Sequence, residues 1–251
     1  MLEALEPDGL LVRYAWTSGL EQPERLARGL RLLSDEERAR AGRFHFERDR
    51  NSYVLAHALA RTLLAQLTGR EPQALRFALG EHGRPELDWP ASSPRVRFNI
   101  SHTHGLVACA LALEHDVGVD VEHVERRLEI GRVAPSVFSP EERRALDALD
   151  GDALRTRFFQ LWTLKEAYIK ARGMGLALPL REITFHLDER RRPEIALGAA
   201  LRDTAERWWL DVRPLGSGHM LALALAHEPR TVGIGELDPT LEAHSWTTSA
   251  P

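Results

Sequence analysis

The sequence predicts a mixed α/β (α+β) protein of two pseudo-symmetric lobes, each a long helix packed on a small antiparallel sheet. In each half, a capping box precedes a long helical stretch that ends at a glycine, Gly69 or Gly173. A short strand and then a hairpin follow in both halves. The order of elements is therefore repeated, which indicates duplication of one α/β unit.

The first half contains the clearer periodic pattern. Residues from about 47 to 68 place apolar side chains on one helical face, and Ser34-Asp35-Glu36-Glu37 is a capping box upstream. Around them we expect a strand at 10–17, a helix at 23–33, a short helix from 34 to about 43, a strand at 75–79, a turn at 83–85, and a hairpin of 95–101 and 106–113.

The second half follows the same plan, with a capping box at Ser139-Pro140-Glu141-Glu142. We expect a helix at 152–172, a strand at 183–187, and a hairpin of 208–214 and 219–226. Ser139, Phe185 and Ala226 follow Ser34, Phe77 and Ala112 by 105, 108 and 114 residues. This near-constant offset supports duplication, and convergent use of common cap and hairpin patterns is the alternative.

Domain boundaries follow from the repeat. We expect an N-terminal lobe at 1–115, a C-terminal lobe at 116–228, and a polar tail at 229–251 that wraps the fold or is partly disordered. A cleft between two lobes is a favoured place for ligands.

Composition limits the class of protein. Of 251 residues, 43% are hydrophobic and 28% charged, and the net charge is −4, so a general nucleic-acid surface is not expected. Cys109 lies in an apolar run, which predicts a buried structural thiol. Early acidic residues argue against a signal peptide, and the apolar runs are too short to span a bilayer. We expect a soluble cytoplasmic protein without a membrane partner.

Two stretches carry the candidate chemistry. Residues 117–122 alternate apolar and acidic, so Asp120 and Glu122 would share one face of a strand, roughly 7 Å apart. Glu166 and Lys170 lie four residues apart and would share a helix face, with Trp162 one turn earlier. Three carboxylates brought together would form a hard oxygen site suited to Mg²⁺. Taken singly, each stretch is more typical of a solvated face or a surface ion pair.

Gly118-Val119-Asp120 and Trp162-Thr163-x-Lys165-Glu166-Ala167-x-x-Lys170 together resemble the signature of 4′-phosphopantetheinyl transferases. The longer branch, typified by the surfactin-synthetase activating enzyme (Sfp-like), is the better match. The resemblance implies two pseudo-symmetric lobes with the active site between them. It also implies transfer of the 4′-phosphopantetheine arm of coenzyme A to a serine of an apo acyl or peptidyl carrier protein, with release of adenosine 3′,5′-bisphosphate. A monomer is expected, because both lobes lie in one chain.

The resemblance also implies roles for individual residues. Asp120, Glu122 and Glu166 would hold Mg²⁺, and Glu166 would in addition act as general base toward the serine. Lys170 would contact the pyrophosphate and stabilise the departing bisphosphate. Lys165 points about 100° away from that helix face, so a structural or partner role is expected for it.

Coenzyme A contacts are implied for residues of the first lobe, namely Arg40, Arg43, Arg50, Arg84, Ser101 and His102. Solvated arginines, a strand-capping serine and an exposed histidine are the alternatives. The chain departs from the family pattern at Glu37 and Asn51-Ser52, where the best-known member has basic residues. Which basic residues hold the 3′-phosphate therefore stays open.

Two other functions are compatible with these motifs. The chain could be a non-catalytic relative that binds coenzyme A or a carrier as a scaffold, although the intact acidic trio argues against decay. It could also be another Mg²⁺-dependent enzyme acting on a nucleotide-like diphosphate, but it lacks the usual phosphate-cradling glycine loops. The sequence leaves open which carrier, of fatty-acid, polyketide or peptide synthesis, would be served.

Overall fold

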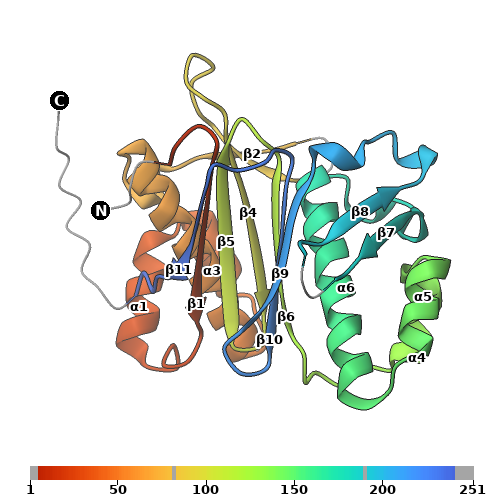
Figure 1. The fold of residues 1–251 in the computed structure, drawn as a ribbon. Coiled ribbons are helices and arrows are strands. Elements are labelled where there is room, and N and C mark those ends of the chain that lie inside the picture. The colour runs from red at the N-terminus through yellow and green to blue at the C-terminus, as the bar shows by residue number, and fades with distance from the viewer. Residues whose placement is uncertain (1–4, 81–82, 189–190, 241–251) are drawn as a thin grey trace. The chain divides into compact units, whose positions relative to one another are not determined.

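The structure is a computed structural model that describes residues 5–80, 83–188 and 191–240. The chain divides into two compact units (Figure 1). The first contains the described residues up to Glu114 and those from Arg230 onward, and the second runs from His115 to Pro229. No helix within the described ranges is long and apolar enough to cross a membrane.

Unit 1 contains a four-stranded sheet in the order β11-β1-β5-β4. Strand β5 pairs antiparallel with both β1 and β4, and β11 pairs parallel with β1. Its elements are β1 (Gly9–Trp16), α1 (Pro23–Leu32), α2 (Asp35–Ala41), α3 (Glu47–Thr68), η1 (Pro72–Ala74), β2 (Phe77–Leu79), β3 (Pro85–Leu87), β4 (Val96–Thr103), β5 (Leu106–Leu113) and β11 (Thr231–Glu236).

The core of unit 1 lies between α3 and its sheet. Leu55, Leu59 and Leu63 recur at helical spacing along α3 and are fully buried in one cluster with Cys109 and Leu111 of β5. Burial raises the pKa of the Cys109 thiol well above its usual range, so the thiol stays protonated and unreactive. The predicted structural role of this cysteine is confirmed.

Unit 2 contains a three-stranded antiparallel sheet in the order β6-β10-β9. Helix α6 packs on β6 and β10, and its Leu164, Tyr168 and Ala171 are fully buried in one cluster with Ala222 and Ala224 of β10. Its elements are β6 (Val117–His123), α4 (Ile130–Val137), α5 (Pro140–Asp147), α6 (Gly151–Arg172), η2 (Gly175–Ala177), η3 (Leu180–Glu182), β7 (Ile183–His186), β8 (Glu194–Leu197), η4 (Ala199–Leu201), η5 (Ala205–Arg207), β9 (Trp209–Leu215) and β10 (His219–Leu225).

The two units repeat one topology, as the sequence predicted. In each, the first strand pairs antiparallel with the last strand of the long hairpin, which pairs in turn with the strand before it. Helices α3 and α6 both have 22 residues and end at a left-handed glycine, Gly69 (φ 66°) and Gly173 (φ 65°). Both capping boxes, at Ser34 and Ser139, are formed. The predicted mixed α/β class of two similar lobes is confirmed.

Some elements were not expected. Residues 231–236, which we expected in a polar tail, form β11, a partly exposed edge strand whose polar and glycine-rich sequence carries no apolar run. Helix α4 was missed because Pro135 lies inside it, and prolines usually interrupt helices. The expectation for 241–251 lies outside the described residues.

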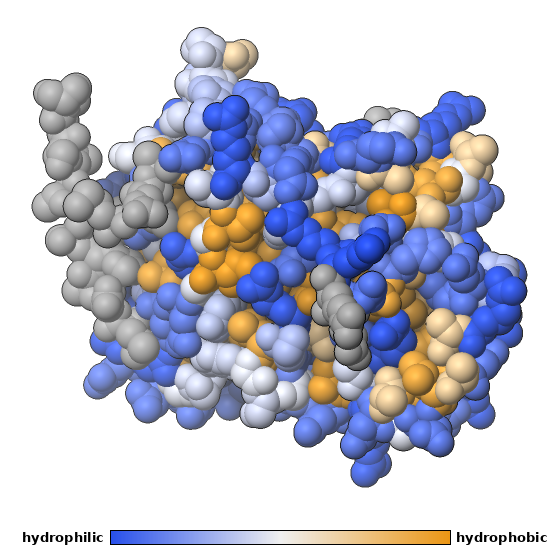
Figure 2. Space-filling view, in the orientation of Figure 1, coloured by the Kyte–Doolittle hydropathy of each residue, from blue (hydrophilic) through white to orange (hydrophobic). Residues whose placement is uncertain are grey.

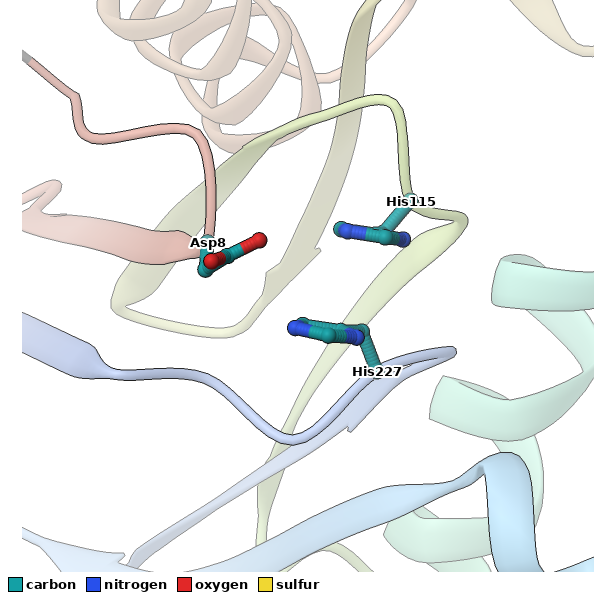
Figure 3. Close-up of side chains that lie close together, drawn as sticks. All are labelled: Asp8, His115 and His227. Atoms are coloured by element: carbon teal, nitrogen blue, oxygen red, sulfur yellow. The ribbon is translucent and has the colours of Figure 1, made fainter.

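The chain enters and leaves unit 2 side by side. The amide of Ala226 donates to the carbonyl of Asp116 at 2.9 Å. Next to this bond, the rings of His115 and His227 are stacked, with centroids 4.1 Å apart and 5° between their planes (Figure 3). Both ends of the unit are thus joined by backbone and ring contacts.

Charged and polar residues make up most of the surface in view (Figure 2).

Candidate active site

Strand β6 and helix α6 bring Asp120 and Glu122 into contact with Lys170 and Trp162. The Lys170 ammonium donates to Asp120 Oδ1 at 2.7 Å and to the carbonyl of Val119 at 3.3 Å. About two turns earlier on α6, the indole Nε1 of Trp162 donates to Glu122 Oε1 at 2.8 Å. The helix face that carries Trp162 and Lys170 therefore lies over the acidic face of β6, as the two periodicities predicted.

Gly118 permits this close approach. A Cβ atom at that position would clash with the carbonyl of Ala167 and would lie 2.6 Å from the amide nitrogen of Ala171, both backbone atoms of α6. Only glycine lets the strand touch the helix backbone here. The packing of β6 against α6 at this site thus requires glycine at position 118.

The carboxylates of the site repel one another. Burial, with the charge of Asp120 as the second cause, raises the pKa of Glu122 to about 7. The same two causes, in the same order, raise the pKa of Glu166, and the charges of Lys170 and Arg126 act in the opposite direction. Neighbouring carboxylates whose ionised forms are disfavoured are the surroundings in which a divalent cation is stabilising. The donor set fits Mg²⁺, which takes hard oxygen ligands.

The three carboxylates do not lie close enough together to coordinate one cation in this arrangement. Among the residues that the structure describes, the ligand atoms of Asp120, Glu122 and Glu166 do not form a group within 4.8 Å of one another. Asp120 is engaged by Lys170, and Glu122 is engaged by Trp162 and Arg126.

Arg126 was not singled out from the sequence. Its Nη2 donates to Glu122 Oε1 at 3.1 Å, and its Nε lies 3.1 Å from Oε2. On a helix, an acid and a cation four residues apart predict an ion pair, but here Glu122 lies in a strand and Arg126 in the turn that follows. Local sequence patterns therefore do not predict the contact between Glu122 and Arg126.

Lys165 has the structural role that was expected. Its ammonium pairs with Glu142 at 2.9 Å, and both side chains are 1% exposed. It also donates to the carbonyls of Leu180 and Ile183, while Glu142 accepts from the amides of Ser139 and Phe185. This buried network ties α6 to α5 and to the start of β7.

The residues predicted to contact coenzyme A lie in unit 1. Ser101 is buried on β4, His102 is exposed beside it, and Arg84 directly precedes β3. Arg40 and Arg43 lie together and, with Glu36, Ala39 and Phe44, line a surface hollow of about 680 Å³. Arg50 instead pairs with Glu47 at 3.7 Å on the exposed start of α3.

The departure at Glu37 has a structural explanation. Its carboxylate closes the capping box at Ser34 and pairs with Arg61 at 2.5 Å, an arginine whose side chain is 3% exposed. Arg61 in turn donates to the carbonyls of Pro72 and Leu75. Glu37 therefore neutralises a buried cation that holds α3 to η1, a use that the sequence did not reveal.

Comparison with known proteins agrees with these motifs. The family profile described as the 4′-phosphopantetheinyl transferase superfamily matches residues 116–224, and the profile described as 4′-phosphopantetheinyl transferase, N-terminal, matches residues 15–114. The chain belongs to the 4′-phosphopantetheinyl transferase superfamily.

Individual relatives match most of the chain. The 4′-phosphopantetheinyl transferase HetI of Nostoc sp. PCC 7120 is 33% identical over 69% of this chain and 73% of its own length. The transferase Sfp of Bacillus subtilis strain 168 is 29% identical over 80% of this chain and 85% of its own, which agrees with the Sfp-like branch. A solved holo-(acyl-carrier-protein) synthase from Bacillus anthracis, in complex with CoA, aligns over 44% of this chain and 93% of its own with 18% identity and a TM-score of 0.37.

Proposed function

We propose that this 4′-phosphopantetheinyl transferase moves the phosphopantetheine arm of coenzyme A to a serine of an apo carrier protein, acyl or peptidyl, in a Mg²⁺-dependent reaction. Adenosine 3′,5′-bisphosphate leaves. The observation that carries the proposal is the placement of Asp120 and Glu122 of β6 beneath the α6 face that bears Lys170. Membership of the superfamily supplies the reaction class.

Asp120, Glu122 and Glu166 would hold the Mg²⁺ ion, which when bound supplies Lewis acidity and charge neutralisation for a pyrophosphate. Glu166 accepts the proton of the carrier serine hydroxyl. Burial and the charge of Asp120 raise the pKa of its carboxyl in the metal-free protein, and a bound Mg²⁺ would favour the ionised form that accepts a proton. Phosphoryl transfer depends mainly on positioning and electrostatics, so a few fixed charges suffice.

Lys170 would act on the leaving group. Its ammonium, held by Asp120 at 2.7 Å, is about one-quarter exposed and can turn to a phosphate oxygen. As negative charge develops on the departing bisphosphate, a cation at that position stabilises it.

Contacts with coenzyme A are proposed for Ser101, His102 and Arg84, and for Arg40 and Arg43. Arg40 and Arg43 line the same hollow, which supports a shared binding role. Their forked guanidinium groups suit phosphate oxygens. Arg50 is proposed with them, although it now pairs with Glu47.

Further proposals concern organisation. We propose lobes at 1–115 and 116–228 with the acidic site in the second, and a monomer that acts in the cytoplasm. The duplicated topology supports the first of these, because each unit has its own sheet and core.

Intact-protein mass spectrometry tests the function. Purified apo carrier proteins of fatty-acid and peptide synthesis are incubated with the chain, coenzyme A and Mg²⁺, with EDTA as the metal-free control. We expect a Mg²⁺-dependent gain of one phosphopantetheine on at least one carrier. Binding of coenzyme A without modification of any carrier would favour the scaffold alternative, and turnover of a free nucleotide without a carrier would favour the other enzyme class.

A further inference from the structure

Glu122 is held by two neighbouring side chains, Trp162 and Arg126. Its Oε1 accepts from Trp162 Nε1 at 2.8 Å and from Arg126 Nη2 at 3.1 Å, while Oε2 lies 3.1 Å from Arg126 Nε. The guanidinium thus contacts both oxygens, through one hydrogen bond from Nη2 and one close charge contact from Nε, and so restrains the carboxylate.

Arg126 is itself fixed in place. Its guanidinium carbon lies 5.5 Å from the ring centroids of both Phe159 and Trp162, so the group lies against two aromatic side chains of α6. Its backbone carbonyl accepts from Arg155 Nη2 at 2.5 Å, and Arg155 Nε donates to the carbonyl of Val124. The turn after β6 is therefore attached to α6 by Arg155, and this attachment holds Arg126 against Glu122.

Among the described residues, each carboxylate of the acidic pair on β6 forms an ion pair with a nearby cation. Lys170 engages Asp120, and Arg126 engages Glu122. Lys170 lies on α6 and carries a proposed role toward the phosphate. Arg126, by contrast, is directed at a proposed metal ligand and is held by contacts that exist without any substrate.

We infer that Arg126 is a positioning residue that orients Glu122, neutralises it in the metal-free protein, and competes with the divalent cation, so that it weakens metal binding. This inference rests on the proposed function, because it needs a metal at Asp120, Glu122 and Glu166. With every group ionised, three carboxylates and two cations give the site one net negative charge. Loss of the Arg126 charge doubles that net charge and so strengthens attraction for a divalent ion.

The test is direct titration of the full chain with Mn²⁺, without coenzyme A, with free Mn²⁺ measured by electron paramagnetic resonance at pH 8. Arg126→Gln removes the charge, and Arg126→Lys keeps it. Arg127→Gln removes the same charge at the adjacent exposed arginine and is the matched control. We expect Arg126→Gln to bind Mn²⁺ about tenfold more tightly, with the other two variants within about twofold of the wild type.

A second readout separates this effect from simple loss of packing. The Mg²⁺ concentration for half-maximal turnover should fall in Arg126→Gln and not in Arg126→Lys, although both variants alter the aromatic contacts of the guanidinium. Equal or weaker Mn²⁺ binding by a folded Arg126→Gln, with intact binding by the wild type, would overturn the inference alone. Absence of Mn²⁺ binding by the wild type would overturn the proposed metal site, and the inference with it.

Discussion

Single residues of the site differ in how tightly they are held. Glu122 is held by contacts with Trp162 and Arg126. At Glu166, burial and the charge of Asp120 raise the pKa of the carboxyl, and the charge of Lys170 acts in the opposite direction. Burial and the charge of Asp120 raise the pKa of both carboxyls, so the two glutamates differ in their contacts and not in the direction of their pKa shift. The proposed role of Glu166 as the base therefore needs its own test.

Glu166→Gln tests the assignment of the base. The amide keeps the size of the side chain but cannot accept the serine proton, so turnover should fall about 10²- to 10⁴-fold. Binding of coenzyme A, measured by calorimetry, should be retained. Glu141→Gln, at an exposed glutamate of α5, is the control. Turnover like that of the wild type in Glu166→Gln would remove this residue from the mechanism.

Asp120→Asn tests the metal assignment. It removes one hard anionic ligand, so the Mg²⁺ concentration for half-maximal turnover should rise about tenfold or more. Arg84→Ala, in the proposed coenzyme-binding set, should change the Mg²⁺ titration far less and act mainly on the KM for coenzyme A. An unchanged Mg²⁺ titration in Asp120→Asn would contradict the assignment.

At the scale of elements, the site depends on the distance between β6 and α6. The strand supplies Asp120 and Glu122, and the helix supplies Glu166 and Lys170. Gly118 is the point of closest contact, because a Cβ there would meet the helix backbone. The elements themselves followed from local patterns, and the long helix α3 spans the same residues, Glu47–Thr68, that its periodicity predicted.

Gly118→Ala should force the two elements apart. We expect it to lower the free energy of unfolding by about 1–3 kcal/mol, as overpacking does, and to reduce turnover as well. Gly131→Ala is the matched control, because a Cβ at Gly131 in α4 meets nothing within 4 Å. That change should be neutral or stabilising by about 0.5–1 kcal/mol. Equal stability of the two variants by urea unfolding would refute the packing argument.

At the scale of the whole molecule, the end of the chain returns to complete unit 1. Strand β11 pairs with β1, and Asp238 forms an ion pair with Arg25 of α1 in which both side chains are about nine-tenths buried. Arg25 also donates to Thr240 Oγ1 at 3.2 Å. Unit 1 is thus assembled from the two ends of the sequence, with unit 2 inserted between them.

Asp238→Ala should therefore destabilise unit 1. It leaves the Arg25 cation buried without its carboxylate, which costs about 3–5 kcal/mol in comparable pairs. The control is Arg230→Ala, which breaks the Arg230–Asp8 pair, whose arginine is 79% exposed; that change should cost about 1 kcal/mol or less. Thermal unfolding of both variants gives the comparison, and similar melting temperatures would show that the Arg25 pair contributes little.

Much of this protein followed from the sequence alone. The repeated helices, caps and hairpins depend on contacts within a few residues, which local periodicity encodes. The same periodicity places Asp120 and Glu122 on one face of a strand, and Glu166 and Lys170 on one face of a helix. Tertiary structure decided the contact of β6 with α6 at Gly118, the pairing of Arg126 with Glu122, and the use of Glu37 to neutralise Arg61. It also decided that a polar, glycine-containing segment becomes β11. Each of these depends on a partner supplied by another element, so no pattern along the chain could specify it.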